Sequence, residues 1–72
     1  MKRNFDQAIA DYNKGLGINP NNAYIVISRA VAYYYKKEYD KAWDDVYKAE
    51  SLGLKVGPGL LKTLKDASGR EK

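Results

Sequence analysis

The sequence predicts an all-α fold of about four helices, on three observations. Apolar residues recur at helical spacing in several segments, and breaks rich in Asn, Gly and Pro punctuate the chain. The chain also matches itself when the segment from Phe5 is laid on the segment from Tyr39. The four predicted helices are about 5–16, 23–37, 40–52 and 58–67.

The first helix is predicted from one apolar stripe at i, i+3, i+4 and i+7. Its members are Phe5, Ala8, Ile9 and Tyr12. Gly15 and Gly17 weaken the end of this segment, and Pro20 follows it. We therefore expect the helix to end near residue 16.

The second helix is predicted to begin after Asn22, a residue type that caps helix N-termini well. It carries two apolar faces. One face comprises Tyr24, Ile27, Val31, Tyr34 and Tyr35, and the other Val26, Ala30 and Tyr33. A helix that is apolar on most of its surface packs on more than one side.

The third helix is expected to be capped by Asp40 and stopped by Gly53. Its apolar face comprises Tyr39, Ala42, Trp43, Val46 and Ala49. Pro58 suits the first turn of the fourth helix. The apolar side of that helix holds Leu60, Leu61 and Leu64, and a polar, frayed tail is expected over 68–72.

Composition limits the chemistry of this chain of 72 residues, which has no cysteine and no histidine. Disulfides are impossible, and the usual zinc and iron ligand sets, the imidazole base and the thiol nucleophile are missing. We therefore expect no enzyme activity, no metal and no cofactor. A core of this size is marginal, so association or a place in a longer helical array is expected to stabilise it.

Charge and hydropathy bear on partners and location. The net charge is +4, but the basic residues are scattered among acids rather than gathered on one face. We therefore do not expect nucleic acid as a partner, although the charge leaves this alternative open. The sequence has neither an 18-residue apolar stretch nor an apolar signal core after Met1. A cytoplasmic location without membrane insertion is expected by default.

The self-match aligns Phe5 with Tyr39, which is an offset of 39 − 5 = 34 positions. Further aligned pairs are Asp6 with Asp40, Ala8 with Ala42, Asp11 with Asp45, Lys14 with Lys48 and Ile18 with Leu52. At this offset the chain resembles the tetratricopeptide repeat. The pattern positions read Val26, Arg29, Ala30, Tyr33, Ala42, Val46 and Leu54, preceded by Ala8, Tyr12 and Pro20. Departures from the family pattern are Val26 for its large aromatic, Arg29 for Leu, Gly15 for Ala and Leu54 for Pro.

The resemblance implies a solenoid fragment of helix-turn-helix units with right-handed superhelical packing. Residues 1–22 would be the second helix of a truncated first repeat, 23–56 a complete repeat, and 57–72 a C-terminal capping helix with its tail. Independently of the resemblance, Arg29 lies amid an apolar helix, and we expect it to form a structural salt bridge with Asp45 or Asp44.

The resemblance also implies a protein or peptide partner in a groove lined by the first helix of the complete repeat. The groove positions are Tyr24, Ile27, Ser28, Val31, Tyr34 and Tyr35. Ser28 replaces the Asn of the carboxylate clamp found in some relatives, and Ile27 and Val31 occupy its basic positions. A hydrophobic or proline-rich segment is therefore expected. Burial of Tyr34 and Tyr35 by a neighbouring chain or by the fourth helix, rather than by a ligand, is the alternative.

The truncated first repeat lacks its partner helix, which would leave the stripe of Phe5, Ile9 and Tyr12 exposed. We therefore predict self-association, with a symmetric dimer as the expected form. Two alternatives to a peptide-binding module remain open. One is a purely structural piece of a longer solenoid, and the other is a basic helical repeat that binds nucleic acid.

Overall fold

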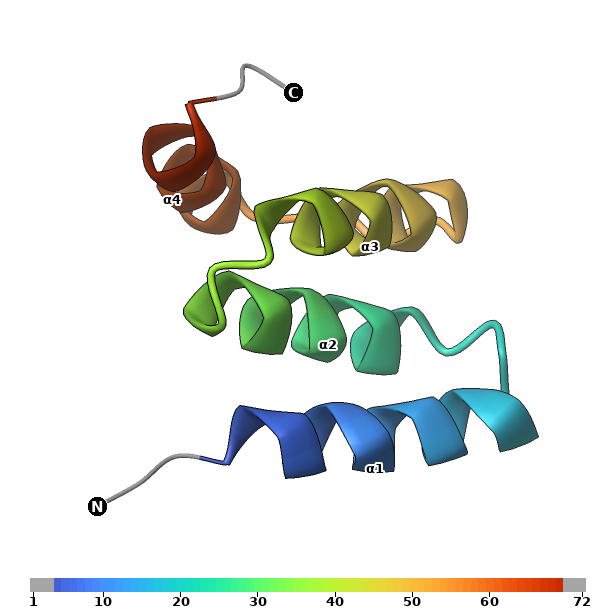
Figure 1. Ribbon diagram of the computed structural model, residues 1–72. Coiled ribbons are helices and arrows are strands. Elements are labelled where there is room, and N and C mark those ends of the chain that lie inside the picture. Colours follow the sequence, from blue (N-terminus) through green and yellow to red (C-terminus); the bar gives the residue numbers. More distant parts are fainter. Residues whose placement is uncertain (1–3, 70–72) are drawn as a thin grey trace.

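The computed structural model describes residues 4–69, which form four α-helices and no strand. The helices are α1 (Phe5–Ile18), α2 (Ala23–Tyr35), α3 (Tyr39–Ser51) and α4 (Pro58–Ser68). Helices α1, α2 and α3 lie side by side and alternate in direction, whereas α4 crosses beside the start of α3 at a steep angle (Figure 1). The predicted all-α fold of four helices is confirmed.

The largest departures from the predicted boundaries are at the ends of α1 and α2, while the bounds of α3 and α4 differ by at most one residue. Helix α1 continues past Gly15 and Gly17 to Ile18, and the backbone N–H of Asn19 still donates to the carbonyl of Gly15 at 2.9 Å. Helix α2 ends at Tyr35, before the predicted residue 37. The division into 1–22, 23–56 and 57–72 stays a prediction. Residues 1–3 and the tail residues 70–72 lie outside the described part of the chain.

The predicted N-terminal cap is present in α2 but not in α3. The Asn22 side chain accepts hydrogen bonds from the backbone N–H groups of Tyr24 and Ile25 at 3.1 and 3.3 Å, so the predicted cap of α2 is confirmed. The predicted Asp40 cap of α3 is wrong. Glu38 occupies the N-cap position without a side-chain cap bond, and Asp40 lies in the first turn. Its negative charge still favours the helix N-terminus there.

Helices α2 and α3 end in the same way, with one residue at positive φ and two backbone N–H groups that donate to carbonyls near the end of the helix. At Gly53, φ is 96°, and the N–H groups of Gly53 and Leu54 donate to the carbonyls of Glu50 and Ala49. This is the glycine stop that the sequence predicts. At Lys37, φ is 64°, and the N–H groups of Lys37 and Glu38 bond back to α2 in the same way. A non-glycine residue in this left-handed conformation carries strain of about 1 kcal/mol.

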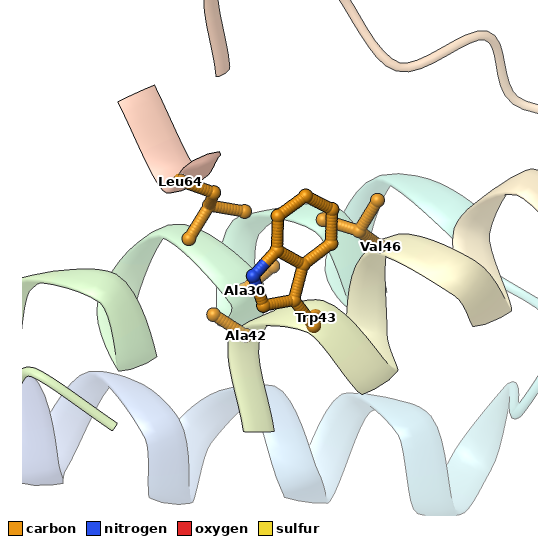
Figure 2. Close-up of a cluster of buried hydrophobic side chains, with 5 residues drawn as sticks. All are labelled: Ala30, Ala42, Trp43, Val46 and Leu64. Atoms are coloured by element: carbon orange, nitrogen blue, oxygen red, sulfur yellow. The ribbon is translucent and has the colours of Figure 1, made fainter. Parts of the chain in front are cut away.

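The core is centred on Trp43, which lies between α2, α3 and α4 (Figure 2). Its fully buried members are Ala30, Ala42, Trp43, Val46 and Leu64. The Trp43 Nε1–H donates to the Ser68 hydroxyl at 3.1 Å, so the buried indole keeps a polar partner. A second cluster of Leu16, Val26 and Ala49 joins α1, α2 and α3. Small alanines at the crossings let the helices approach closely.

The repeat register extends into α4. Leu64 stands at the same offset from Ala30 as Tyr39 does from Phe5, and both Leu64 and Ala30 are fully buried in the cluster around α3. Helix α4 therefore contacts α3 through the same register position that α2 uses. The second helix of the complete repeat is thus covered on two sides.

Candidate protein-interaction surface

The predicted groove residues form one face of α2, here called the α2 face: Tyr24, Ile27, Ser28, Val31, Tyr34 and Tyr35. Tyr24 is 73% exposed and Tyr35 49% exposed, while the other four are half-buried. The Ser28 hydroxyl donates to the carbonyl of Tyr24 at 2.8 Å, which occupies its only proton within the helix. The α2 face is therefore partly open, with Tyr24 as its most accessible side chain.

Four aromatic rings run across one end of the three side-by-side helices. Phe5 stacks on Tyr35 with ring centroids 5.1 Å apart and an interplanar angle of 9°. Tyr34 meets Tyr35 edge-on at 5.1 Å and Tyr39 at a tilt at 6.1 Å. This aromatic ladder of Phe5, Tyr35, Tyr34 and Tyr39 ties α1 to α2 and α3. Part of the predicted groove therefore packs within the chain rather than facing a ligand.

The predicted dimerisation stripe does not form an open surface. Ile9 is only 8% exposed and belongs to the core, and Phe5 is half-buried by its stack on Tyr35. Tyr12 is also half-buried. We expected the stripe of Phe5, Ile9 and Tyr12 to be exposed. This is wrong for Ile9, which is buried, and for Phe5, whose ring packs on Tyr35 of α2. Helical spacing defines a face but does not say which neighbour covers it.

Arg29 is the centre of a polar network that joins three helices. Its guanidinium donates to Asp45 on α3 at 2.6 and 2.8 Å and to the Asn13 side chain on α1 at 2.8 Å. The Asp45 hydrogen bond is the main cause that raises the pKa of Arg29 above its usual value. Of the two carboxylates left open by the sequence, Asp45 is the partner, and it is only 4% exposed. This bidentate pair is structural, because both of its partners are engaged within the fold.

A second set of charges surrounds the turn between α2 and α3. The Glu38 carboxylate lies 3.1 Å from the Nζ atoms of both Lys41 and Lys36, and Lys36 also pairs with Asp6 on α1. Hydrogen bonds to Lys41 first and Lys36 second lower the pKa of Glu38, and the bonds to Asp6 and Glu38 raise the pKa of Lys36. The Lys36 and Glu38 side chains are each 32% exposed, and Asp6 and Lys41 are more open, so solvent screens these pairs and they fix the turn more than they stabilise the fold.

An open cavity of about 380 Å³ lies where the end of α4 meets this turn. Its lining consists of Lys37, Glu38, Tyr39, Asp40, Lys41 and Ser68. Two cations and two anions leave no net charge to select an ionic ligand, and the lining is mostly polar. No sequence pattern indicates this cavity, because Ser68 is far along the chain from the turn that supplies the other residues.

Within residues 4–69, no three side chains of the metal-ligating types gather into a group that could hold an ion. None of the helices in this part of the chain combines the length and apolarity needed to cross a bilayer.

Comparison with known proteins places the chain among helical repeats. It is 41% identical over 51 residues to human tetratricopeptide repeat protein 28 and 39% identical over 51 residues to the mouse protein of the same name. Each match covers 71% of this chain but only 2% of the relative. Human Protein SGT1 homolog is 30% identical over 54 residues, which are 75% of this chain and 15% of that protein.

No family model matches the chain, and no solved structure matches it either. The chain spans a small part of the curated relatives that it matches. The similarity to these relatives, the internal offset that lays Phe5 on Tyr39 and the alternating helices agree with one another. Together they identify the chain as a helical repeat of the tetratricopeptide type.

Proposed function

We propose that this chain is a protein-interaction module, without enzyme activity, that binds a hydrophobic or proline-rich segment on the α2 face. Tetratricopeptide relatives support a protein-interaction scaffold in general. The observation that favours the α2 face is Tyr24, whose large side chain is 73% exposed although it lies on a helix packed on two sides.

The chemistry of the α2 face determines the kind of segment that fits. Tyr24 and Tyr35 are the most exposed side chains of the face and carry hydroxyl groups, while Val31 and Ile27, which also packs against the core, are half-buried between them. Tyrosine buries much apolar area while its hydroxyl keeps a polar partner, which suits proline-rich and apolar peptides. The face contains no charged side chain, so a ligand recognised mainly by its carboxylate fits poorly.

Titration with two synthetic peptides tests this proposal. One is a proline-rich decapeptide and the other a leucine-rich amphipathic peptide, each followed by amide chemical-shift changes in the labelled chain. We expect at least one to shift resonances of α2, and Tyr24→Ala to weaken its binding about tenfold or more, as for an exposed aromatic anchor.

Ile18→Ala is the matched control, because Ile18 is an apolar residue that is 88% exposed but lies on α1. It should leave peptide affinity unchanged. Shifts spread over the whole surface, or equal binding by Tyr24→Ala and the unmodified chain, would contradict the proposal.

Self-association is the second part of the proposed function. It is supported by the small core of this chain of 72 residues and by α1, which packs extensively only on α2 among the described helices. Sedimentation at micromolar concentrations tests it. We expect a dimer whose population rises with concentration, and a folded chain that stays strictly monomeric would contradict it.

A further inference from the structure

Helix α4 lies on an apolar surface formed by α2 and α3, here called the α4 seat: Ala30, Ala42, Trp43 and Val46. All four residues are fully buried, and Leu64 of α4 is the other fully buried member of their cluster (Figure 2). None of the four belongs to the α2 face. The α4 seat is therefore a second surface, distinct from the one to which the proposed function refers.

Helix α4 meets the seat with residues of one helix face. Leu60, Leu61 and Leu64 pack in the cluster, and the Ser68 hydroxyl accepts the hydrogen bond from the Trp43 Nε1–H at 3.1 Å. The same hydroxyl donates to the carbonyl of Leu64 at 2.6 Å, which leaves its oxygen to accept from the indole. Leucines at i, i+1 and i+4 and a hydroxyl at i+8 therefore form the pattern that the seat contacts. Most other side chains of α4 are exposed to solvent: Lys62, Thr63, Lys65, Asp66 and Ala67.

The attachment of α4 to the seat is small. Helix α4 packs on α3 much less extensively than α2 does, and Leu64 is the single buried residue within Pro58–Ser68. Its main anchor points are this leucine and the hydrogen bond from Trp43 to Ser68. A contact of this size opens locally at a lower free-energy cost than the pairing of α2 with α3.

A hinge precedes α4. The linker before it is anchored, because Leu54 and Val56 are half-buried and pack against the buried clusters. Gly57 and Gly59 then flank Pro58, and all three residues are exposed. Space is open where a Cβ of either glycine would lie. Rotation about the glycine backbone therefore lets α4 leave the seat while Leu54 and Val56 stay in place.

We propose that the α4 seat binds an amphipathic helix of a partner protein that carries the leucine and hydroxyl pattern of α4, and that α4 is the resident occupant which this helix replaces. This inference goes beyond the proposed function, because it adds a second surface and does not depend on the α2 face. Helix α4 acts as an intramolecular competitor, since its short tether holds it near the seat at an effective concentration on the order of millimolar. The apparent affinity for the partner helix therefore rises with the fraction of molecules in which α4 has left the seat.

The chemistry of the seat favours a helix over other ligands. The seat carries no charged side chain, so a ligand recognised by its charges gains nothing there. Ala30 and Ala42 let a helix approach closely, and the indole N–H of Trp43 needs an acceptor once it is buried. A helix supplies that acceptor as a hydroxyl while its own backbone N–H and C=O groups stay paired. An extended segment would bury unpaired backbone groups against the seat, which costs free energy.

The indole signal of Trp43 tests this replacement. Trp43 is the one tryptophan of the chain, so its indole N–H gives a single resonance in the nitrogen–proton NMR spectrum. Ser68→Ala removes the acceptor on α4 and should shift this resonance. It should also raise the apparent affinity for an added helix by about threefold or more, because α4 is then held less firmly. Adding the unlabelled peptide of residues 57–69, with its serine retained, should return the resonance towards its position in the unmodified chain.

Variants of the peptide provide matched controls. The peptide carrying Ser68→Ala should bind without returning the indole resonance. The peptide carrying Leu64→Ala should bind at least tenfold more weakly, because it loses the buried leucine. The peptide carrying Lys65→Ala changes an exposed position and should bind as the unmodified peptide does.

Two results would overturn the inference: an indole resonance that does not move at millimolar peptide, or one that returns equally with and without the peptide's serine. Loss of the effect when the chain carries Tyr24→Ala overturns it as well, because the peptide would then lie on the α2 face. Return of the resonance in the Tyr24→Ala chain supports the α4 seat even where the α2 face binds no peptide. The failure of one proposal is thereby distinguished from the failure of the other.

Discussion

Helices α1 and α3 occupy the same place in the repeat but have different neighbours. Helix α3 packs against α2 on one side and α4 on the other, whereas α1 packs extensively only on α2 among the described helices. Trp43 is fully buried, and Ile9, its counterpart in the repeat register, keeps 8% of its surface exposed. Three further pairs in the repeat register differ more. The residues on α3 are fully buried, whereas those on α1 are half-buried: Ala42 and Ala8, Val46 and Tyr12, Ala49 and Gly15.

This difference shows that position in a repeat determines where a side chain points, while neighbours determine how far it is buried. Repeat units depend on adjacent units for much of their stability. Helix α1 should therefore contribute less to stability than α3 and tolerate substitution better.

The largest expected effect comes from truncating the central indole. Trp43→Ala should cost about 3–5 kcal/mol, because it leaves a cavity shared by three helices, and this is enough to unfold a small domain. Ile9→Ala should cost about 2 kcal/mol, since its site opens to solvent on one side. Urea unfolding followed by circular dichroism measures both.

Trp43→Phe provides a graded variant that should stay folded, because it keeps most of the buried ring but loses the bond to Ser68. If Ile9→Ala proved as costly as Trp43→Ala, the proposed inequality between α1 and α3 would be refuted.

The second expected effect separates the two arms of the Arg29 network. Asp45→Ala leaves the Arg29 guanidinium without its bidentate partner, and we expect a loss of about 2–3 kcal/mol. Asn13→Ala removes the single bond from α1 and should cost less than about 1 kcal/mol. Thermal unfolding of both variants gives the comparison. Similar losses would mean that α1 is held by this network as firmly as α3.

The smallest expected effect concerns glycine substitutions at two positions, one inside α1 and one after the end of α3. Gly17 has a helical backbone and open space where a Cβ would lie, so Gly17→Ala should stabilise the chain by about 0.5–1 kcal/mol. The contrasting variant is Gly53→Ala, which should destabilise it by about 1 kcal/mol, because φ there is +96°. Denaturation midpoints measure both shifts. No gain from Gly17→Ala would show that the end of α1 is not limited by helix propensity.

Much of the fold could be predicted because its signals are local. The apolar spacing indicated four helices, the Asn22 side chain caps α2, and Gly53 ends α3 in a left-handed conformation. The offset between Phe5 and Tyr39 then indicated the repeat type. Lys37 could not be foreseen, because its left-handed conformation follows from closing the turn between two packed helices and not from its own preference.

The candidate site was less predictable because it depends on which helices meet. Tyr24 lies exposed as the groove interpretation requires, but Phe5 and Tyr35 stack on each other, and Ile9 joins the core. The choice between Asp44 and Asp45 for Arg29 likewise needed the three-dimensional arrangement. Spacing along a helix predicts which side chains share a face. Which of them contact another helix depends on how the helices pack.

From the Arg29 network we also expect a particular order of local opening. Fraying of α1 breaks the bond between Arg29 and Asn13 but leaves the bidentate pair with Asp45 in place. The hairpin of α2 and α3 can then persist as a cooperative unit after α1 has detached. Amide hydrogens of α1 should consequently exchange with solvent well before those of α2 and α3, even under conditions where most molecules remain native.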